Sequence, residues 1–196
     1  MTRILLLGAS GQLGQQLCRT LSRVGTVIVI NRATLDLCQP HQIPTVVLPI
    51  QPDLLINAAA YNAVDRAETE VSQADAVNAI APAVLAEVAK TLTIPLIHFS
   101  TNYVFDGEST TPYDENDVPN PINAYGRSKL SGEIHIRQTW ERHLILRTAW
   151  LYGIGHSSNF LNTICGWQPS NRNYESLPIS SALLPLPLTL PMPSNP

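Results

Sequence analysis

The sequence predicts an α/β fold in which helices cover a parallel β-sheet. Short apolar runs of strand length alternate along the chain with longer segments whose apolar residues recur at helical spacing. The strand-like runs are almost continuously apolar, as is typical of parallel strands that are buried on both faces. Right-handed crossovers would then join successive strands. These observations predict a Rossmann-like, doubly wound parallel sheet.

The expected elements follow one another in a regular order. The first strand ends in a glycine-rich turn, and the helix after it carries Leu13, Leu17 and Leu21 on one face. A weakly helical, proline-containing stretch separates the second strand from the third. Strands are expected at residues 3–7, 26–30, 53–57, 95–99 and 143–146, and longer helices at 72–91 and 127–140.

Composition excludes several classes of partner. The chain has 196 residues and a formal net charge of -3, so it lacks the basic footprint of a nucleic-acid-binding protein. No apolar run reaches membrane-spanning length, and no signal-peptide pattern precedes the first strand. The three cysteines, Cys18, Cys38 and Cys165, show no metal-ligand spacing. We therefore expect a reduced, cytoplasmic protein without nucleic-acid or membrane partners.

A dinucleotide site is predicted at the first turn. Gly8, Gly11 and Gly14 follow a strand and open a helix, which lets the backbone approach a pyrophosphate and point amide groups at it. The GxxGxxG spacing is the form common in extended short-chain dehydrogenases. A glycine triplet alone is often only a turn, but the strand–turn–helix context favours cofactor binding.

The type of cofactor is indicated by the end of the second strand. An acid that would bind a ribose 2'-hydroxyl is absent there, and Asn31 and Arg32 take its place. Because an arginine tolerates a 2'-phosphate, NADPH is the favoured cofactor and NADH the alternative. Arg32 could equally be a solvated surface charge. The loop at Asp36 and Leu37 is where adenine would be contacted.

Small residues end the third strand. Ala58, Ala59 and Ala60 follow Asn57, and their small side chains would let a nicotinamide dinucleotide pass close to the sheet edge. Tight packing between helix and sheet is the alternative reason for the alanines.

A proton donor is predicted beyond the fourth strand. Thr101 stands near the end of that strand, and Tyr125 and Lys129 lie four residues apart. On a helix both would point the same way, so that the ammonium lowers the pKa of the phenol. The phenol could then protonate the alkoxide formed in ketone reduction, while Thr101 holds the substrate oxygen. An ordinary amphipathic pair is the alternative.

Five sequence blocks resemble those of the dTDP-4-dehydrorhamnose reductase family of extended short-chain dehydrogenases. The blocks are GASGQLG (8–14), NAAAYNAVDRAE (57–68), STNYVFDG (100–107), YGRSK (125–129) and RTAWLYG (147–153). The resemblance implies that NAD(P)H delivers hydride to C4 of a dTDP-4-keto sugar while Tyr125 protonates the oxygen. Thr101 and Lys129 would complete the triad, with Lys129 also bonding the nicotinamide ribose.

The resemblance also implies further contacts. Asn102 and Trp150 would touch the sugar, although Trp150 could instead be a core residue. The family usually has aspartate at the position of Asn102, and a neutral amide there would weaken binding. Some members dimerise through magnesium held by acidic residues, where this chain has Gln15 and Gln16. We expect no metal, and a homodimer is left open. The implied cofactor contacts are Gly11, Gln12, Leu13, Asp36, Leu37, Ala60 and Tyr61.

The last part of the chain breaks the pattern. Residues 177–196 contain no charged residue and six prolines, which neither a helix nor a sheet can accommodate. We expect an NAD(P)-binding domain with the catalytic residues at 1–164 and a proline-rich, disordered tail at 165–196. The substrate lobe of the family would then be missing or incomplete. A frameshift or truncation near Cys165 would explain the tail, and a natural disordered segment is the alternative.

Two other functions remain open from the sequence. One is a different nucleotide-sugar enzyme of the same superfamily, such as an epimerase or dehydratase. The other is a non-catalytic cofactor-binding regulatory module or an inactive fragment. Net consumption of NADPH that requires the keto sugar would distinguish the reductase from both.

Overall fold

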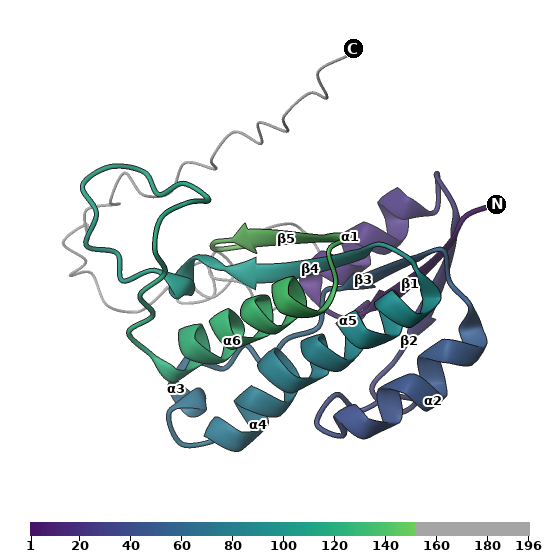
Figure 1. Cartoon of the computed structure of the whole chain (residues 1–196), viewed down its shortest axis with the longest axis horizontal. Helices are drawn as coiled ribbons and strands as arrows, with labels where there is room; N and C mark the ends of the chain where they lie inside the picture. The colour runs from purple at the N-terminus through teal and green to yellow at the C-terminus, as the bar shows by residue number, and fades with distance from the viewer. Residues whose placement is uncertain (152–196) are drawn as a thin grey trace, which may run out of the picture.

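Five parallel strands form the centre of the protein in the computed structural model, which describes residues 1–151 (Figure 1). Their order across the sheet is β2-β1-β3-β4-β5. The strand after β1 is added on one side of it and the later strands on the other side, so the strand order reverses next to β1. In α/β sheets, ligands bind outside the carboxyl ends of the strands at such a reversal. The strands are β1 (Arg3–Leu7), β2 (Thr26–Ile30), β3 (Leu54–Asn57), β4 (Leu96–Thr101) and β5 (His143–Thr148).

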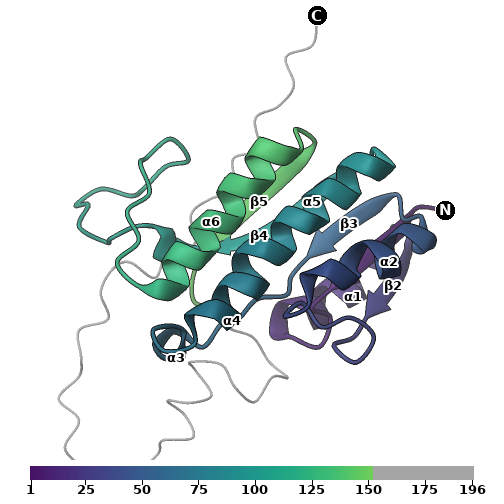
Figure 2. The same ribbon diagram turned by 60° about the horizontal axis from the view of Figure 1, so that its bottom comes forward.

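Helices cover both faces of this sheet, as Figures 1 and 2 show. One face carries α2 (Ile43–Val47), α5 (Ala81–Leu92) and α6 (Ala124–Thr139), and the other carries α1 (Gln12–Leu21). The fold-class prediction is confirmed. The shorter helical elements are η1 (Pro40–Gln42), η2 (Leu48–Ile50), α3 (Val64–Ala67), α4 (Val71–Asp75), the π-helical segment η3 (Ala76–Ile80) and η4 (Asn102–Val104).

The core lies on both sides of the sheet because successive residues of a strand face opposite ways. Leu5 of β1 packs in one cluster with Leu85 of α5, whereas its neighbour Leu6 packs in another with Leu17 of α1. All five residues of β1 except Arg3 are buried. Burial on both faces is the reason that the strand reads as a continuous apolar run.

Two predicted helices differ in detail from the observed ones. The helix expected at 127–140 begins at Ala124, because the Asn123 side chain caps it by accepting a hydrogen bond from the Gly126 N–H at 2.7 Å. Tyr125 therefore lies in its first turn. The helix expected at 72–91 is interrupted by the π-helical segment η3, a feature often found at functional sites.

Some predictions fall beyond the described residues. The domain border at 164 and the tail at 165–196 both lie outside residues 1–151. In the described part of the chain, no helix combines the length and the apolar character that crossing a membrane requires.

Candidate active site

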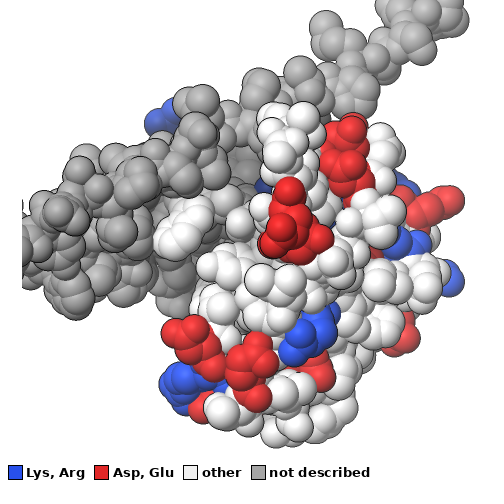
Figure 3. Space-filling model, turned by 90° about the vertical axis from the view of Figure 1, so that its left-hand side faces the viewer, with Lys and Arg blue, Asp and Glu red and all other residues white. Residues whose placement is uncertain are grey.

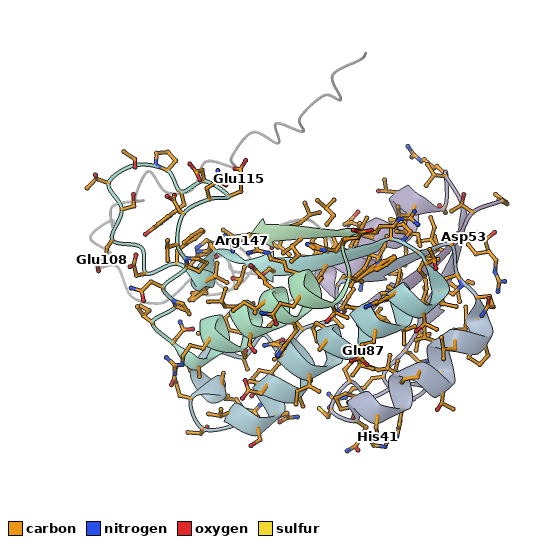
Figure 4. All side chains as sticks on the ribbon, viewed as in Figure 1. His41, Asp53, Glu87, Glu108, Glu115 and Arg147 are labelled. Atoms are coloured by element: carbon orange, nitrogen blue, oxygen red, sulfur yellow. The ribbon has the colours of Figure 1, made fainter. Side chains whose placement is uncertain are left out.

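The predicted site residues gather at the carboxyl edge of the sheet. They come from the turns after β1, β2 and β3, from the end of β4 and from the first turns of α6. Register pairing aligns Leu7 with Asn57 across β1 and β3, and Thr101 with Thr148 across β4 and β5. In Figure 4, Glu108 and Glu115 mark the loop after β4 at this end, whereas Asp53 lies at the opposite end.

Backbone atoms build the glycine turn. Gly8 has φ of +80°, and a Cβ atom there would lie 2.5 Å from the Ala58 carbonyl carbon. A Cβ atom on Gly14 would lie 2.1 Å from the Gly8 carbonyl oxygen. Gly11 is the N-cap of α1 and makes no side-chain capping bond. The close packing of Gly8 and Gly14 places the N-terminus of α1 beside the end of β1, and this arrangement fits a dinucleotide pyrophosphate.

The turn after β2 is held by its own side chains. The Asn31 carboxamide oxygen accepts hydrogen bonds from the Thr34 N–H and hydroxyl. Arg32 is exposed and pairs with Asp36 at 3.5 Å, as a surface charge would. This pair also keeps the guanidinium beside the loop where the adenosine part of the cofactor is predicted to bind. The Leu37 side chain is buried in the core, so any contact from Leu37 to a cofactor would come from its backbone.

The loop after β3 is tied to the π-helical segment. Asn78 of η3 accepts a hydrogen bond from the Tyr61 N–H at 2.9 Å and donates to the Tyr61 carbonyl at 3.0 Å. It also donates to the Ser128 hydroxyl of α6 at 3.0 Å. The Tyr61 hydroxyl donates to Glu70 at 2.6 Å. Asn78 thus joins the predicted cofactor loop to the helix that carries Tyr125 and Lys129.

Tyr125 and Thr101 meet at the site. The Tyr125 ring is 8% exposed and lies edge-on to Tyr103, and its hydroxyl donates to the Asn62 side chain at 3.4 Å. Burial raises the pKa of the Tyr125 phenol, a hydrogen bond with Thr101 opposes the rise, and Tyr103 adds to it. The expectation that Lys129 lowers this pKa is wrong in this structure, because burial dominates and the lysine makes its hydrogen bonds elsewhere.

Lys129 is buried against β4. Its ammonium nitrogen donates to the Phe99 carbonyl at 2.7 Å and lies 3.2 Å from His98 Nε2. Burial lowers the pKa of Lys129 to about 8, against the opposing effect of Glu133. His98 is fully buried, and burial and then the charge of Lys129 hold its pKa well below the usual value. The sequence predicted Lys129 but not this partner.

A buried ion pair supports the same helix. Glu133 is fully buried one turn beyond Lys129, and its two carboxylate oxygens accept from Arg147 of β5 at 2.9 and 2.7 Å. Arg137 donates to the same carboxylate at 3.2 Å. The Arg147 guanidinium also stacks over the Phe105 ring, with its central carbon 4.9 Å from the centroid. The pair fastens α6 to β5 close to the site.

The start of α6 is fixed by an acid from a distant segment. Glu68 accepts a hydrogen bond from the Ala124 N–H at 2.7 Å. Glu70, two residues further along, accepts a hydrogen bond from the Tyr61 hydroxyl. Both bind segments that carry site residues, because the chain folds this charged stretch back onto α6 and Tyr61.

The predicted sugar contacts lie at the same edge. The Thr101 hydroxyl donates to the Asn102 side chain at 3.4 Å and accepts from the Tyr103 N–H at 3.2 Å. Trp150 is 49% exposed, with φ of 42°, so its alternative assignment as a core residue is wrong. Figure 3 faces this end of the molecule, and the described charges visible there are of both signs.

Three polar residues of the site were not singled out from the sequence. Asn62 lies within the block at 57–68, but only the fold brings it to Tyr125. His98 and Asn78 stand in apolar segments. The only sign of their role in the sequence was that each is a single polar residue among apolar ones. Among residues 1–151, no group of three histidine, cysteine or acidic residues is placed to hold a metal ion.

Comparison with known families and proteins gives consistent matches. Residues 1–175 match the family described as RmlD substrate binding domain. The chain is 42% identical over 162 residues to the dTDP-4-dehydrorhamnose reductase of Burkholderia thailandensis, covering 83% of this chain and 54% of the relative. It is 39% identical over 165 residues to that of Escherichia coli K12, covering 82% and 55%. The chain thus spans about half the length of these relatives.

A solved structure shows the same similarity. The dTDP-4-dehydrorhamnose reductase of Bacillus anthracis, solved in complex with NADP, superposes with a TM-score of 0.80 at 37% identity. The match covers 85% of this chain and 59% of that structure. The likeness in fold and sequence therefore extends over most of this chain.

Proposed function

This chain belongs to the RmlD substrate binding domain family, and from that premise we propose that it takes part in the NADPH-dependent reduction of a dTDP-4-keto sugar. The observation that carries the proposal is the juxtaposition of two features. The glycine turn after β1 and the group of Thr101, Tyr125 and Lys129 lie at one edge of the sheet. A hydride carrier and a proton donor would thereby meet on one substrate.

NADPH is the proposed cofactor, and when bound it would supply the hydride for the ketone carbon. Gly8, Gly11, Gln12, Leu13 and Gly14 would hold its pyrophosphate through backbone at the N-terminus of α1. Around the rest of the cofactor we propose contacts from Asn31, Arg32, Asp36, Leu37, Ala58, Ala59, Ala60, Tyr61 and Lys129. The absence of an acid after β2 and the exposed Arg32 favour the 2'-phosphate form over NADH.

Tyr125 is the proposed acid. Because burial raises its pKa, the phenol is protonated at neutral pH and holds a proton to give. As the carbonyl oxygen gains negative charge, the phenolic O–H bond breaks and a new O–H bond forms on the sugar. Thr101 would hold that oxygen, and Lys129, one turn further along α6, is the third proposed catalytic residue.

Asn102 and Trp150 are proposed to contact the sugar ring, the amide as donor and acceptor and the exposed indole as a flat apolar surface. The proposed substrate is dTDP-4-dehydro-L-rhamnose, and the names of the relatives, which are dTDP-4-dehydrorhamnose reductases, support this proposal. A homodimer and a cytoplasmic location complete the proposal as predictions.

The experiment is to follow NADPH consumption by the 196-residue chain with and without dTDP-4-dehydro-L-rhamnose. The proposal expects consumption only when the sugar is present. Tight NADPH binding without any turnover would instead assign the chain a cofactor-binding, regulatory role. Sugar conversion without net NADPH consumption would indicate an epimerase.

A further inference from the structure

A chain of four polar groups runs through the interior beneath the site. The Ala59 N–H donates to the Asn57 side-chain oxygen at 3.1 Å, and the Asn57 amide nitrogen lies 3.1 Å from His98 Nδ1. His98 Nε2 in turn lies 3.2 Å from the Lys129 nitrogen. Asn57 and His98 are fully buried and Lys129 is 1% exposed. We call these four groups the buried relay.

The donors and acceptors of the buried relay do not match when Lys129 is charged. An ammonium and a backbone N–H can only donate, whereas an amide and a neutral imidazole each offer one donor side and one acceptor side. If all three contacts between these four groups are to be hydrogen bonds, one of the two terminal groups must act as an acceptor. With a donor-only group at each end, one contact must set two donors against each other.

A neutral Lys129 removes this mismatch. Asn57 then donates to His98 Nδ1, the ring carries its proton on Nε2, and Nε2–H donates to the amine lone pair of Lys129. When Lys129 is charged, it donates to a bare Nε2 and the ring proton moves to Nδ1. The Asn57 amide then turns its oxygen toward His98 and no longer accepts from the Ala59 N–H.

We propose that His98 is a positioning residue for Lys129, and that the hydrogen bonds of the buried relay reverse direction when the lysine gains or loses its proton. The ring keeps one proton in both states, so the proton that is added comes from solvent and resides on the lysine nitrogen. In the charged state the Ala59 N–H is released. That group lies in the loop that we expect to contact the cofactor.

The hydrogen bonds of the buried relay should reverse at a pH that can be reached in solution. Burial lowers the pKa of Lys129 to about 8, and Glu133 on the next turn of α6 opposes the shift. Burial also keeps His98 neutral near pH 7, because its pKa is well below the usual value. Besides Lys129 and Glu133, α6 carries Tyr125, Arg127, His135 and Arg137, and β5 carries His143 and Arg147. Arg137 and Arg147 both pair with Glu133.

The test is the ring tautomer of His98, measured by long-range proton–nitrogen correlation NMR on the full chain labelled with nitrogen-15 in histidine. The expected result is a proton on Nδ1 below pH 8 and on Nε2 above it, with a midpoint near the pKa of about 8 of Lys129. Its signals are assigned by their loss in His98→Gln. A tautomer that stays the same on both sides of this range, or a doubly protonated ring, would overturn the proposal.

Two controls separate the relay from a purely structural role. In Lys129→Met the acceptor and the charge are gone, so His98 should keep its proton on Nε2 on both sides of pH 8. His143 serves as an internal control, because its Nδ1 faces the Trp140 carbonyl and must donate to it throughout. A switch that persists in Lys129→Met would also overturn the proposal. The bearing of the relay on catalysis rests on the proposed function, whereas the tautomer does not depend on turnover.

Discussion

The glycine turn and the β4–α6 side of the site are built in different ways. The proposed cofactor site at residues 8–14 is built from backbone, and the space around Gly8 and Gly14 is so tight that a single added carbon meets another backbone atom. The β4–α6 side is built from buried side chains that pair over long distances in sequence, such as His98 with Lys129 and Glu133 with Arg147.

Because the two regions are built differently, they are not equally recognisable from the sequence. A backbone site depends on residues close together in the chain, so spacing alone marks it. A site of buried polar pairs depends on which strand lies beside which helix, and only its chemically distinctive members stand out. The two regions should therefore respond differently to substitution. The glycine turn should be sensitive to added side-chain volume, and the β4–α6 side should be sensitive to the loss of charge or of hydrogen bonds.

The largest expected effect comes from Tyr125→Phe. Removal of the phenolic proton should lower turnover by about 10²- to 10⁴-fold, because the group acts in the transition state. NADPH affinity, measured by fluorescence titration, should stay nearly unchanged because the glycine turn is untouched. Equal turnover in the variant and the parent would remove Tyr125 from the role of acid.

Glu133→Gln should be the most destabilising change on the β4–α6 side. It removes the charge from a fully buried carboxylate that binds Arg147 and Arg137, and a broken buried ion pair costs about 3–5 kcal/mol. The free energy of unfolding from urea titration measures the loss. Glu87→Gln is the matched control, since Glu87 is exposed on α5. Similar losses in both variants would contradict the account of this pair.

Gly14→Ala should break the backbone-built region through volume alone. Its Cβ atom would lie 2.1 Å from the Gly8 carbonyl oxygen, and such overpacking costs about 1–3 kcal/mol. Gly11→Ala is the control, because its nearest atom would be 3.3 Å away. Urea unfolding should separate the two variants. If Gly11→Ala proved the more destabilising, the steric account of the turn would fail.

Glu68→Gln should have a smaller effect. Its carboxylate is half-exposed and accepts from the Ala124 N–H at the start of α6, where a negative charge contributes about 0.3–1 kcal/mol. The variant keeps an oxygen acceptor and loses the charge. We expect a modest fall in unfolding free energy that shrinks at high salt. A loss that does not depend on salt would point to the hydrogen bond rather than the charge.

Asp106→Asn should have the smallest effect on the free energy of unfolding, and this effect should depend on pH. The Glu108 N–H, Asn120 and Tyr113 donate to this carboxylate and lower its pKa to about 2. A lowered folded pKa stabilises the fold above the unfolded value of about 3.9, and this contribution is lost as pH falls toward 2. Asp106→Asn should therefore reduce the loss of stability between pH 6 and 3, measured by urea unfolding. An unchanged acid profile would contradict this.

The fold was largely predictable because its signal is local. Each strand is a short apolar run, and β1 is buried on both faces. The start of α6 was placed three residues late because the Asn123 cap is a single polar residue after a proline-rich loop. The π-helical segment leaves no mark in hydrophobic spacing, so the position of Asn78 relative to Tyr61 and Ser128 could not be foreseen.

The candidate site was predictable only in part. Thr101, Tyr125 and Lys129 stood out by residue type, and the structure brings Thr101 and Tyr125 together. The direction of the pKa shift on Tyr125 was wrong, because burial of its ring depends on long-range packing. His98 was not singled out, since neither its burial nor its pairing with Lys129 and Asn57 can be derived from a strand taken alone.

We propose that the glycine turn and the Thr101–Tyr125 pair form one site for hydride transfer. The most direct test of this proposal is to supply NADPH that carries deuterium on the transferring carbon, together with dTDP-4-dehydro-L-rhamnose, and to weigh the sugar product by mass spectrometry. We expect a product with a single deuterium at C4 from the parent chain and almost none from Tyr125→Phe. No labelled product from the parent chain, or equal labelling by Tyr125→Phe, would contradict it.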